Sequence, residues 1–297
     1  MTSEHFDAVI VGAGFAGIGA AIQLKRMGYE NFVILDREDD LGGTWHVNHY
    51  PGLAVDVPTT TYSYFFEPNP NWSRLFSTGG EIKQYAGDVA DKYDVRRHMR
   101  FGTVVESARW DEEAALWRVA LAGGETVSAR FLFTATGFLS QPHMPDIPGI
   151  EHVITSNEAL DLPALPNRIV IVGGGYIACE FACILNGLGT HVTQWHRGPQ
   201  VLRGFDDEVR GHIAELMLAQ GIDLRVGVSP RALERCDDGR IRVIGSDDHK
   251  VVVDEVLWAT GRKPNSDGLG LEDLGVEIGE RGEVIVDGYS QTAVPSI

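Results

Sequence analysis

The sequence predicts an α/β protein that contains two nested Rossmann-like, FAD/NAD(P)-type dinucleotide-binding domains, each with a three-layer ββα architecture. The first observation is the stretch Val9–Gly17, where an apolar strand stops at a G-x-G-x-x-G turn and a helix begins. The second is Ile169–Ala178, which repeats this pattern with alanine at the third position. The third is that each copy is followed by an apolar strand ending in Ala-Thr-Gly, at Ala135–Gly137 and Ala259–Gly261. An internal repeat of this kind makes chance an unlikely origin for either copy.

The first copy has the residues that a turn around a pyrophosphate needs. Gly12 permits the tight turn, Gly14 leaves room for the ligand, and Gly17 lets the helix pack on the strand. The next strand ends in Asp36, at about the spacing of an acid that binds a ribose diol. Because a carboxylate would repel a 2′-phosphate, this turn suits FAD or NAD. The alternative is a glycine-rich turn in an ordinary α/β protein.

An irregular, aromatic and glycine-rich stretch follows at Leu41–Gly52, and it is typical of a loop that lines a flat ligand. The alternative is a surface loop with incidental aromatic residues. Asp56 comes next and could serve as a loop cap, and a helix is predicted over Glu81–Tyr93. The spacing of His46 and His49 resembles a metal pair, but no third ligand is suggested, so no metal site is predicted.

Short strands are predicted around residues 104–105, 117–119 and 126–127, with a glycine hairpin turn between the last two. The buried strand that ends at Gly137 leads into an extended, proline-rich connection. We therefore predict an FAD-binding domain at residues 1–152 plus 262–297 and an NADPH-binding domain at residues 153–261.

The second copy has no acidic residue at the position that Asp36 occupies in the first copy. Its second strand, Val192–Trp195, is followed by His196 and Arg197, and Arg203 comes six residues later. Two guanidinium groups in an acidic protein suit the 2′-phosphate of NADP, although each could be a solvated surface side chain. The two copies thus suggest FAD first and NADPH second, with hydride passing from nicotinamide to flavin. The helix that follows is predicted over Asp206–Ala219.

Composition narrows the possible partners. The chain has 297 residues, is 43% hydrophobic and carries a formal net charge of −17, which argues against nucleic acid or an anionic membrane. Its three cysteines form no disulfide framework, which indicates a reducing compartment. The sequence shows no signal peptide and no apolar run of about 18 residues. We expect a cytoplasmic monomer or weak dimer.

Two family resemblances follow from these motifs. Residues from about 6 to 150 resemble the FAD domain of Baeyer–Villiger and related flavin monooxygenases, and residues from about 153 to 297 resemble the NADPH domain of glutathione reductase. The first resemblance rests on Gly12–Gly17, Gly42–Trp45, Asn48–Gly52 with Asp56, and Ala135–Pro142; the second rests on Ile154–Pro163, Gly173–Ala182 and Ala259–Asn265. The resemblance changes family near residue 151, which implies a natural or engineered chimera.

Each half of the sequence lacks residues that are needed by the family which the other half resembles. Glutathione reductases place a redox-active cysteine pair where this sequence has Trp45 and Tyr50, and a lysine where it has Leu53. The resemblance therefore implies no dithiol relay, and it implies that Glu180 is buried without its lysine partner. The monooxygenase fingerprint expected after residue 149 and the segment with that family's catalytic arginine are also missing. Because the sequence stops at Ile297, before the families' flavin-contacting Gly-Asp motif, we expect weakened flavin retention.

The resulting hypothesis is an NADPH-dependent flavoprotein of monooxygenase type that uses O2. Its organic substrate is either a ketone or absent, and most of its NADPH oxidation is expected to be uncoupled. The alternatives are a glutathione reductase-like enzyme, a diaphorase, or a recombined protein that binds cofactor without turnover. Asp56 and Tyr176 are implied as catalytic residues, Tyr176 as a gate over the flavin. The implied cofactor-binding residues are Gly12, Gly14, Phe15, Ala16, Gly17, Asp36, Arg37, Gly43, Thr44, Trp45, Tyr50, Asp56, Tyr62, Val105, Thr136, Gly137, Gly173, Gly175, Tyr176, Ile177, Glu180, Arg197, Arg203, Thr260 and Gly261.

Overall fold

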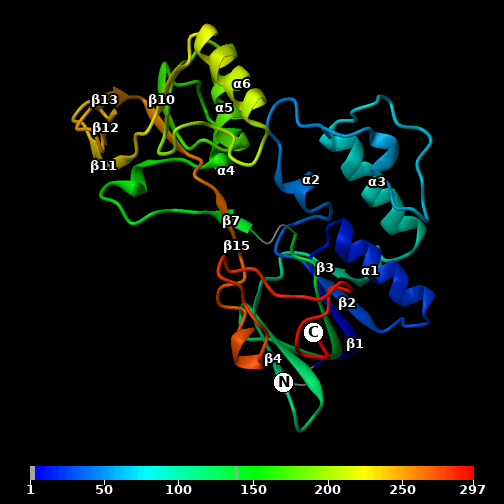
Figure 1. Cartoon of the computed structure of the whole chain (residues 1–297). Coiled ribbons are helices and arrows are strands. Elements are labelled where there is room, and N and C mark those ends of the chain that lie inside the picture. The colour runs from blue at the N-terminus through cyan, green and yellow to red at the C-terminus, as the bar shows by residue number, and fades with distance from the viewer. Residues whose placement is uncertain (1–3, 138–139) are drawn as a thin grey trace. The chain divides into compact units, whose positions relative to one another are not determined.

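The computed structural model describes residues 4–137 and 140–297, and its contacts divide the chain into two compact units, Met1–Phe138 and Leu139–Ile297. Figure 1 shows the course of the chain through both units. Phe138 and Leu139, which belong to one of the monooxygenase-like motifs, lie outside the described residues.

The first unit is built on one six-stranded sheet in the order β3-β2-β1-β6-β5-β4. Strands β1, β2, β3 and β6 are parallel, whereas β4 and β5 continue the sheet as an antiparallel meander. The elements are β1 (Glu4–Val11), α1 (Phe15–Arg26), β2 (Phe32–Leu35), α2 (Thr44–Val47), the 3-10 turn Thr59–Thr61, α3 (Gly79–Lys92), the 3-10 turn Arg96–His98, β3 (Met99–Arg100), β4 (Val105–Asp111), β5 (Leu116–Leu121) and β6 (Thr126–Thr134).

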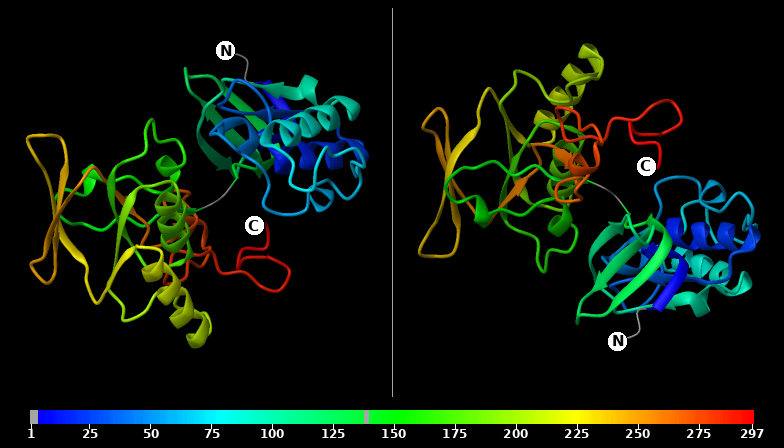
Figure 2. Two further views of the ribbon diagram at one scale, coloured as in Figure 1. Left: turned by 90° about the horizontal axis from the view of Figure 1, so that it is seen from above. Right: turned by 90° about the horizontal axis from the view of Figure 1, so that it is seen from below.

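The side chains of each strand point alternately to the two faces of the sheet, and this alternation gives the unit three layers. Ala8 and Ile10 of β1 belong to a core that includes α1 and α3, whereas Val9 belongs to a second core with the meander. Since successive strand residues point to opposite faces, one strand serves both cores. Figure 2 shows α1 and α3 together on one face of the sheet. Helix α3 begins just before the predicted helix, because the side chain of Thr78 accepts a hydrogen bond from the backbone N–H of Glu81.

The second unit repeats this arrangement. A parallel sheet in the order β10-β9-β8-β14 is accompanied by an antiparallel meander β11-β12-β13 and by a two-stranded sheet β15-β7. The elements are β7 (Ser140–Pro142), the 3-10 turn Ile150–His152, α4 (Ser156–Ala159), β8 (Arg168–Val172), α5 (Tyr176–Gly187), β9 (His191–His196), α6 (Asp207–Ala219), β10 (Asp223–Val226), β11 (Pro230–Arg235), β12 (Ile241–Gly245), β13 (Lys250–Val253), β14 (Glu255–Trp258), β15 (Arg262–Pro264) and the 3-10 turn Glu272–Leu274.

The layers of the second unit follow from the same alternation along β8. Ile169 and Ile171 pack with α5 and α6, and Val170 and Val172 pack with the meander. The predicted Rossmann-like fold with three-layer ββα architecture is therefore confirmed. The assignment of residues 262–297 to the FAD-binding domain stays a prediction.

Candidate functional site

The first glycine turn lies between β1 and α1, and two of its glycines cannot carry a side chain. Gly12 has φ +110°, and a Cβ atom there would overlap the carbonyl oxygen of Ala135. A Cβ atom on Gly17 would overlap the carbonyl oxygen of Gly12. Gly14 is the N-cap of α1, whose first turn has neither a side-chain cap nor an acidic residue. The free N–H groups of this turn are therefore suited to a phosphate.

Asp36 lies directly beside this turn. Its Oδ2 accepts a hydrogen bond of 2.6 Å from the backbone N–H of Ala13, and its Oδ1 accepts one of 3.0 Å from Glu38. The backbone N–H of Gly12 donates to the carbonyl of Leu35 over 2.8 Å, which fixes the residue after β2 at the turn. The carboxylate is half-buried and held where a ribose bound at the turn would meet it.

A second glycine segment packs against the first. Gly43 has φ +54°, and a Cβ atom there would come within 3.1 Å of the Cα of Gly14. Gly42 donates its N–H to the carbonyl of Ala13 over 3.1 Å. The short helix α2 then presents Trp45, whose Nε1 donates to the hydroxyl of Tyr62 over 3.2 Å.

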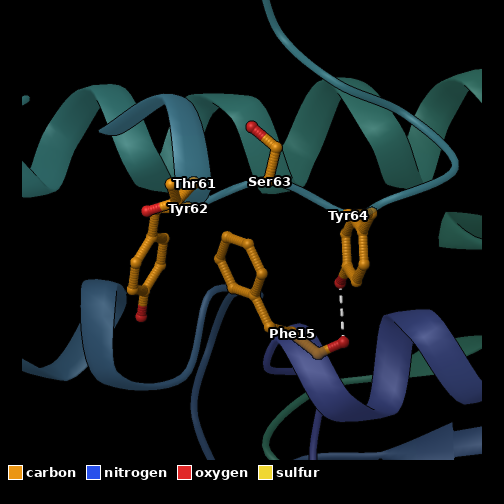
Figure 3. Close-up of a pocket in the computed structure, with 5 residues that line it drawn as sticks. All are labelled: Phe15, Thr61, Tyr62, Ser63 and Tyr64. Carbon is orange, nitrogen blue, oxygen red and sulfur yellow. Dashed lines mark hydrogen bonds between the residues drawn. The ribbon is translucent and has the colours of Figure 1, made fainter. Parts of the chain in front are cut away.

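Figure 3 shows the small open pocket of about 220 Å³ that Phe15 and residues 61–64 line. The ring of Phe15 lies between Tyr62 and Tyr64, with centroid distances of 5.7 and 5.3 Å. Tyr64 donates its hydroxyl hydrogen to the carbonyl of Phe15 over 2.6 Å, and burial raises the pKa of Tyr64 well above its usual range. The predicted residues Phe15, Trp45 and Tyr62 are thus brought together beside the glycine turn.

Other predicted residues of the first unit lie differently. Asp56 is exposed, as are Thr136 and Gly137 at the end of β6, and Arg37 is an exposed side chain whose Nε pairs with Glu38 over 2.9 Å. Val105 packs against the meander core. Ala16 and Thr44 are exposed at the starts of α1 and α2, and Tyr50 is half-buried.

The second glycine turn, between β8 and α5, repeats the backbone geometry of the first. Gly173 has φ +141°, and a Cβ atom there would overlap the carbonyl oxygen of Ala259. Its N–H donates to the carbonyl of Trp195 over 2.9 Å. Gly175 is the uncapped N-cap of α5, and a Cβ atom on it would have nothing within 4 Å. This turn is therefore also open to a phosphate.

Arg197 and Arg203 are exposed on the loop after β9, and neither forms an ion pair within the part of the chain that the structure describes. The loop is held in place on both sides. The N–H of Leu202 donates to the carbonyl of Gly174 over 2.6 Å. Arg210 of α6 donates its Nε to the carbonyl of Val201 over 2.8 Å and pairs with Asp207. Two unpaired guanidinium groups on a fixed loop can bind a phosphate monoester.

His196 also lies at the second turn, although it is not among the site residues predicted from the sequence. Its ring lies so close to Gly174 that a Cβ atom on that glycine would overlap it. Burial lowers the pKa of His196, and the neighbouring Arg197, Arg210 and Arg203 lower it further, whereas a hydrogen bond to the backbone of Gln200 raises it. The signal was available in the sequence, because His196 follows the predicted strand Val192–Trp195 as Asp36 follows the second strand predicted for the first copy.

One expectation about the second copy, the burial of Glu180, is not met. Glu180 is exposed, so the expectation that it is buried without a partner is wrong: it faces outward on α5, which buries Ala178, Cys179 and Phe181 instead. Tyr176 is also exposed, at 57%, and Ile177 is half-buried. Thr260 accepts a hydrogen bond of 2.9 Å from Trp258 Nε1, and the carbonyl of Gly261 accepts one of 3.0 Å from His143.

The described residues contain neither a membrane-spanning helix nor a cluster of metal-binding side chains. None of the helices within 4–137 and 140–297 has both the length and the apolar character that crossing a bilayer requires. Among the same residues, no group of three or more His, Cys, Asp or Glu side chains could hold a metal ion.

Comparison with known proteins places both resemblances on one chain. A family model described as pyridine nucleotide-disulphide oxidoreductase matches residues 6–297. A glutathione reductase of Burkholderia cepacia is 38% identical over 306 residues, covering 100% of this chain and 66% of the relative. A Baeyer-Villiger monooxygenase of Streptomyces coelicolor is 37% identical over 203 residues, covering 66% of this chain and 38% of the relative. The chain thus spans about two thirds or less of the length of these relatives.

Solved structures show the same fold. The HOCl-induced flavoprotein disulfide reductase RclA from Escherichia coli, in its Cu(II) complex, has a TM-score of 0.68 at 23% identity, covering 99% of this chain and 64% of the other. An open structure of cyclohexanone monooxygenase has a TM-score of 0.65 at 20% identity, covering 95% of this chain and 78% of the other.

Proposed function

The chain belongs to the pyridine nucleotide-disulphide oxidoreductase family, and we propose that it is an NADPH-dependent oxidoreductase with FAD as its flavin. One observation carries the proposal: the two glycine turns share a backbone geometry but carry opposite charges where a ribose would lie. Asp36 is held at the first turn, whereas Arg197 and Arg203 lie on the loop fixed to the second. A carboxylate selects a free ribose diol, and guanidinium groups select a 2′-phosphate.

The residues present fit both cofactors. At the first turn, the uncapped N-terminus of α1 would hold the FAD pyrophosphate, and Asp36 would bind the adenosine ribose. Gly43 and Trp45 would lie beside the rest of the FAD molecule. At the second turn, the uncapped N-terminus of α5 would hold the pyrophosphate of NADPH. The flavin, when bound, accepts a hydride from nicotinamide and passes electrons on. Tyr176, exposed at the start of α5, would act as a movable cover.

The acceptor we favour is O2, with a ketone as the optional organic substrate. This proposal rests on the match of 66% of the chain to a Baeyer-Villiger monooxygenase and on Trp45 and Tyr50, which the resemblance places where glutathione reductases have cysteines. Asp56, exposed after the aromatic loop, is the proposed polar group beside the reacting atoms. We expect NADPH oxidation to be mostly uncoupled and to yield hydrogen peroxide.

We also propose that the chain is a chimera in which monooxygenase-like sequence changes to glutathione reductase-like sequence near residue 151. The proposal rests on the positions of the motifs, which are monooxygenase-like up to Pro142 and glutathione reductase-like from Ile154 onward. A glutathione reductase nevertheless matches the whole chain. A second candidate function, glutathione reductase-like or diaphorase activity, is favoured by that same full-length match.

Anaerobic stopped-flow reduction of the bound flavin by NADPH and by NADH tests the proposal. We expect faster and tighter-binding reduction with NADPH. Equal rates with NADH would contradict the role of the arginine pair, and an absence of reduction would favour a protein that only binds cofactor. Aerobic product analysis with a ketone, with glutathione disulfide and with an artificial dye then separates the acceptors.

A further inference from the structure

His196 occupies the position in the second unit that Asp36 occupies in the first. The N–H of Gly12 donates to the carbonyl of Leu35, and the N–H of Gly173 donates to the carbonyl of Trp195. The next residue in each case stands where a ribose bound at the turn would lie. Building on the proposed function, we propose that His196 is a third cationic ligand of the coenzyme 2′-phosphate and that binding of this phosphate is coupled to proton uptake by its imidazole ring.

The backbone beside the turn leaves space for the imidazole ring of His196. In the first unit, Ala13 stands at the middle of the turn and donates its N–H to Asp36. In the second unit the corresponding residue is Gly174, and a Cβ atom on it would overlap the His196 ring. Gly198 is equally constrained, since a Cβ atom there would lie 2.6 Å from Nε2 of the same ring. Glycine at both positions therefore makes room for the imidazole.

The charged groups that face this ring are cations from three places. Arg197 is the next residue, Arg203 comes from the loop that Leu202 ties to the turn, and Arg210 comes from α6. The carbonyl of Gln200 accepts a hydrogen bond of 3.2 Å from Arg210, and the backbone of Gln200 also partners the ring. Burial first, and then these arginines, hold the pKa of His196 below its usual value, so the ring is mainly neutral at neutral pH without ligand.

A bound phosphate would raise the pKa of His196 again. Its negative charge compensates the arginines and favours the imidazolium form, so the ring takes up a proton in the pH range between its free and bound pKa values. By linkage, the affinity for a 2′-phosphorylated ligand rises as the pH falls through that range. A ligand without the 2′-phosphate gives no such coupling.

The test is isothermal titration calorimetry of the full chain with 2′,5′-ADP and with 5′-AMP, in two buffers of different ionisation enthalpy. The phosphate itself has a second pKa of about 6 and can release a proton on binding, so the comparison with His196→Gln isolates the contribution of the ring. His191→Gln, at the other end of β9, is the matched control. Thermal unfolding of each variant checks that the fold is kept.

We expect the wild type and H191Q to take up a larger fraction of a proton with 2′,5′-ADP than H196Q does, and no difference with 5′-AMP. Equal proton uptake in wild type and H196Q would overturn the inference while leaving the proposed function intact. A wild type that does not prefer 2′,5′-ADP over 5′-AMP would overturn both the inference and the NADPH proposal. If H196Q loses its fold, His196→Asn with the same readout replaces it.

Discussion

At the scale of single residues, the proposed determinants of the ligand preference are the charged side chains that come after the second strand of each repeat. Asp36 is held by Ala13 and Glu38, whereas Arg197 and Arg203 have no ion-pair partner among the described residues. Hydrogen bonds to charged groups contribute about 1.5–3 kcal/mol each, so either position has a measurable effect on its own.

We predict that Arg203→Ala weakens NADPH binding by about tenfold and leaves NADH binding nearly unchanged, because only NADPH has a 2′-phosphate. Arg231→Ala, an exposed arginine of β11 that pairs with Asp248, serves as a control for loss of charge. Fluorescence titration with both coenzymes measures the effect. A parallel loss for NADH would argue that Arg203 acts on the loop and not on the phosphate.

Asp36→Asn tests the first turn in the same way. The amide keeps the shape of the side chain but removes the charge and one acceptor, so we predict at least a tenfold loss of FAD affinity. Binding of FAD to apoprotein, followed by quenching of flavin fluorescence, measures it. Glu106→Gln, an exposed residue of β4, should have no effect; unchanged FAD affinity in D36N would remove Asp36 from the site.

His98 gives a pH-dependent stability of the first unit. Its ring stacks on Phe32 at 4.1 Å and hydrogen-bonds to the carbonyl of Phe32, and burial lowers the pKa of His98 below its usual value of 6.5. The unfolded state therefore binds more protons than the folded state in this range, so stability falls as pH drops through 6.5. Urea unfolding about one pH unit above and below that value should show the loss. His98→Gln should reduce the slope, and an unaltered slope would show that other groups cause it.

At the scale of elements, each site is a strand, a glycine turn and a helix, and the glycines of one turn have different tasks. Gly173 is required by backbone geometry, since its φ is +141° and a Cβ atom would overlap the carbonyl of Ala259. Gly175 has an ordinary φ of −81° and open space around it. Glycine at this second position suits a ligand that approaches the backbone closely, and glycine is also favoured over alanine at a helix N-cap.

We therefore predict opposite outcomes for two alanine variants of the same turn. Gly173→Ala should destabilise the protein by about 2–4 kcal/mol through overlap and strain. Gly175→Ala should change stability by less than about 1 kcal/mol yet weaken binding of 2′,5′-ADP at least tenfold, because the methyl group fills the place of the pyrophosphate. Thermal unfolding and calorimetry on both variants check this, and a Gly175→Ala protein that binds normally would refute the phosphate assignment.

At the scale of the whole molecule, sulfur chemistry is confined to the second unit. The structure describes Cys179, Cys183 and Cys236 as free, and the sequence has no cysteine among its first 138 residues. Burial raises the pKa of the Cys179 thiol, which makes it a poor nucleophile, whereas Cys183 is exposed. The aromatic loop at the first turn therefore has no thiol with which to reduce a disulfide.

From this we predict that glutathione disulfide does not increase the rate at which the chain consumes NADPH, whereas O2 or an artificial dye sustains consumption. Coenzyme absorbance with and without each acceptor measures the rates. Replacing all three cysteines by serine should leave the dye-linked rate within about twofold, since none lies at a proposed site. Consumption driven by glutathione disulfide would favour the second candidate function.

The sequence by itself determined the repeat, both glycine turns and the opposite charges that follow them, because these features depend on local backbone requirements and on residue type. It could not establish that Glu180 faces outward on α5, that Phe15 packs between Tyr62 and Tyr64, or that the ring of His196 fills the space left by Gly174. Those facts depend on which segments far apart in the chain pack together. Packing is a property of the assembled layers, so only the tertiary structure decided them.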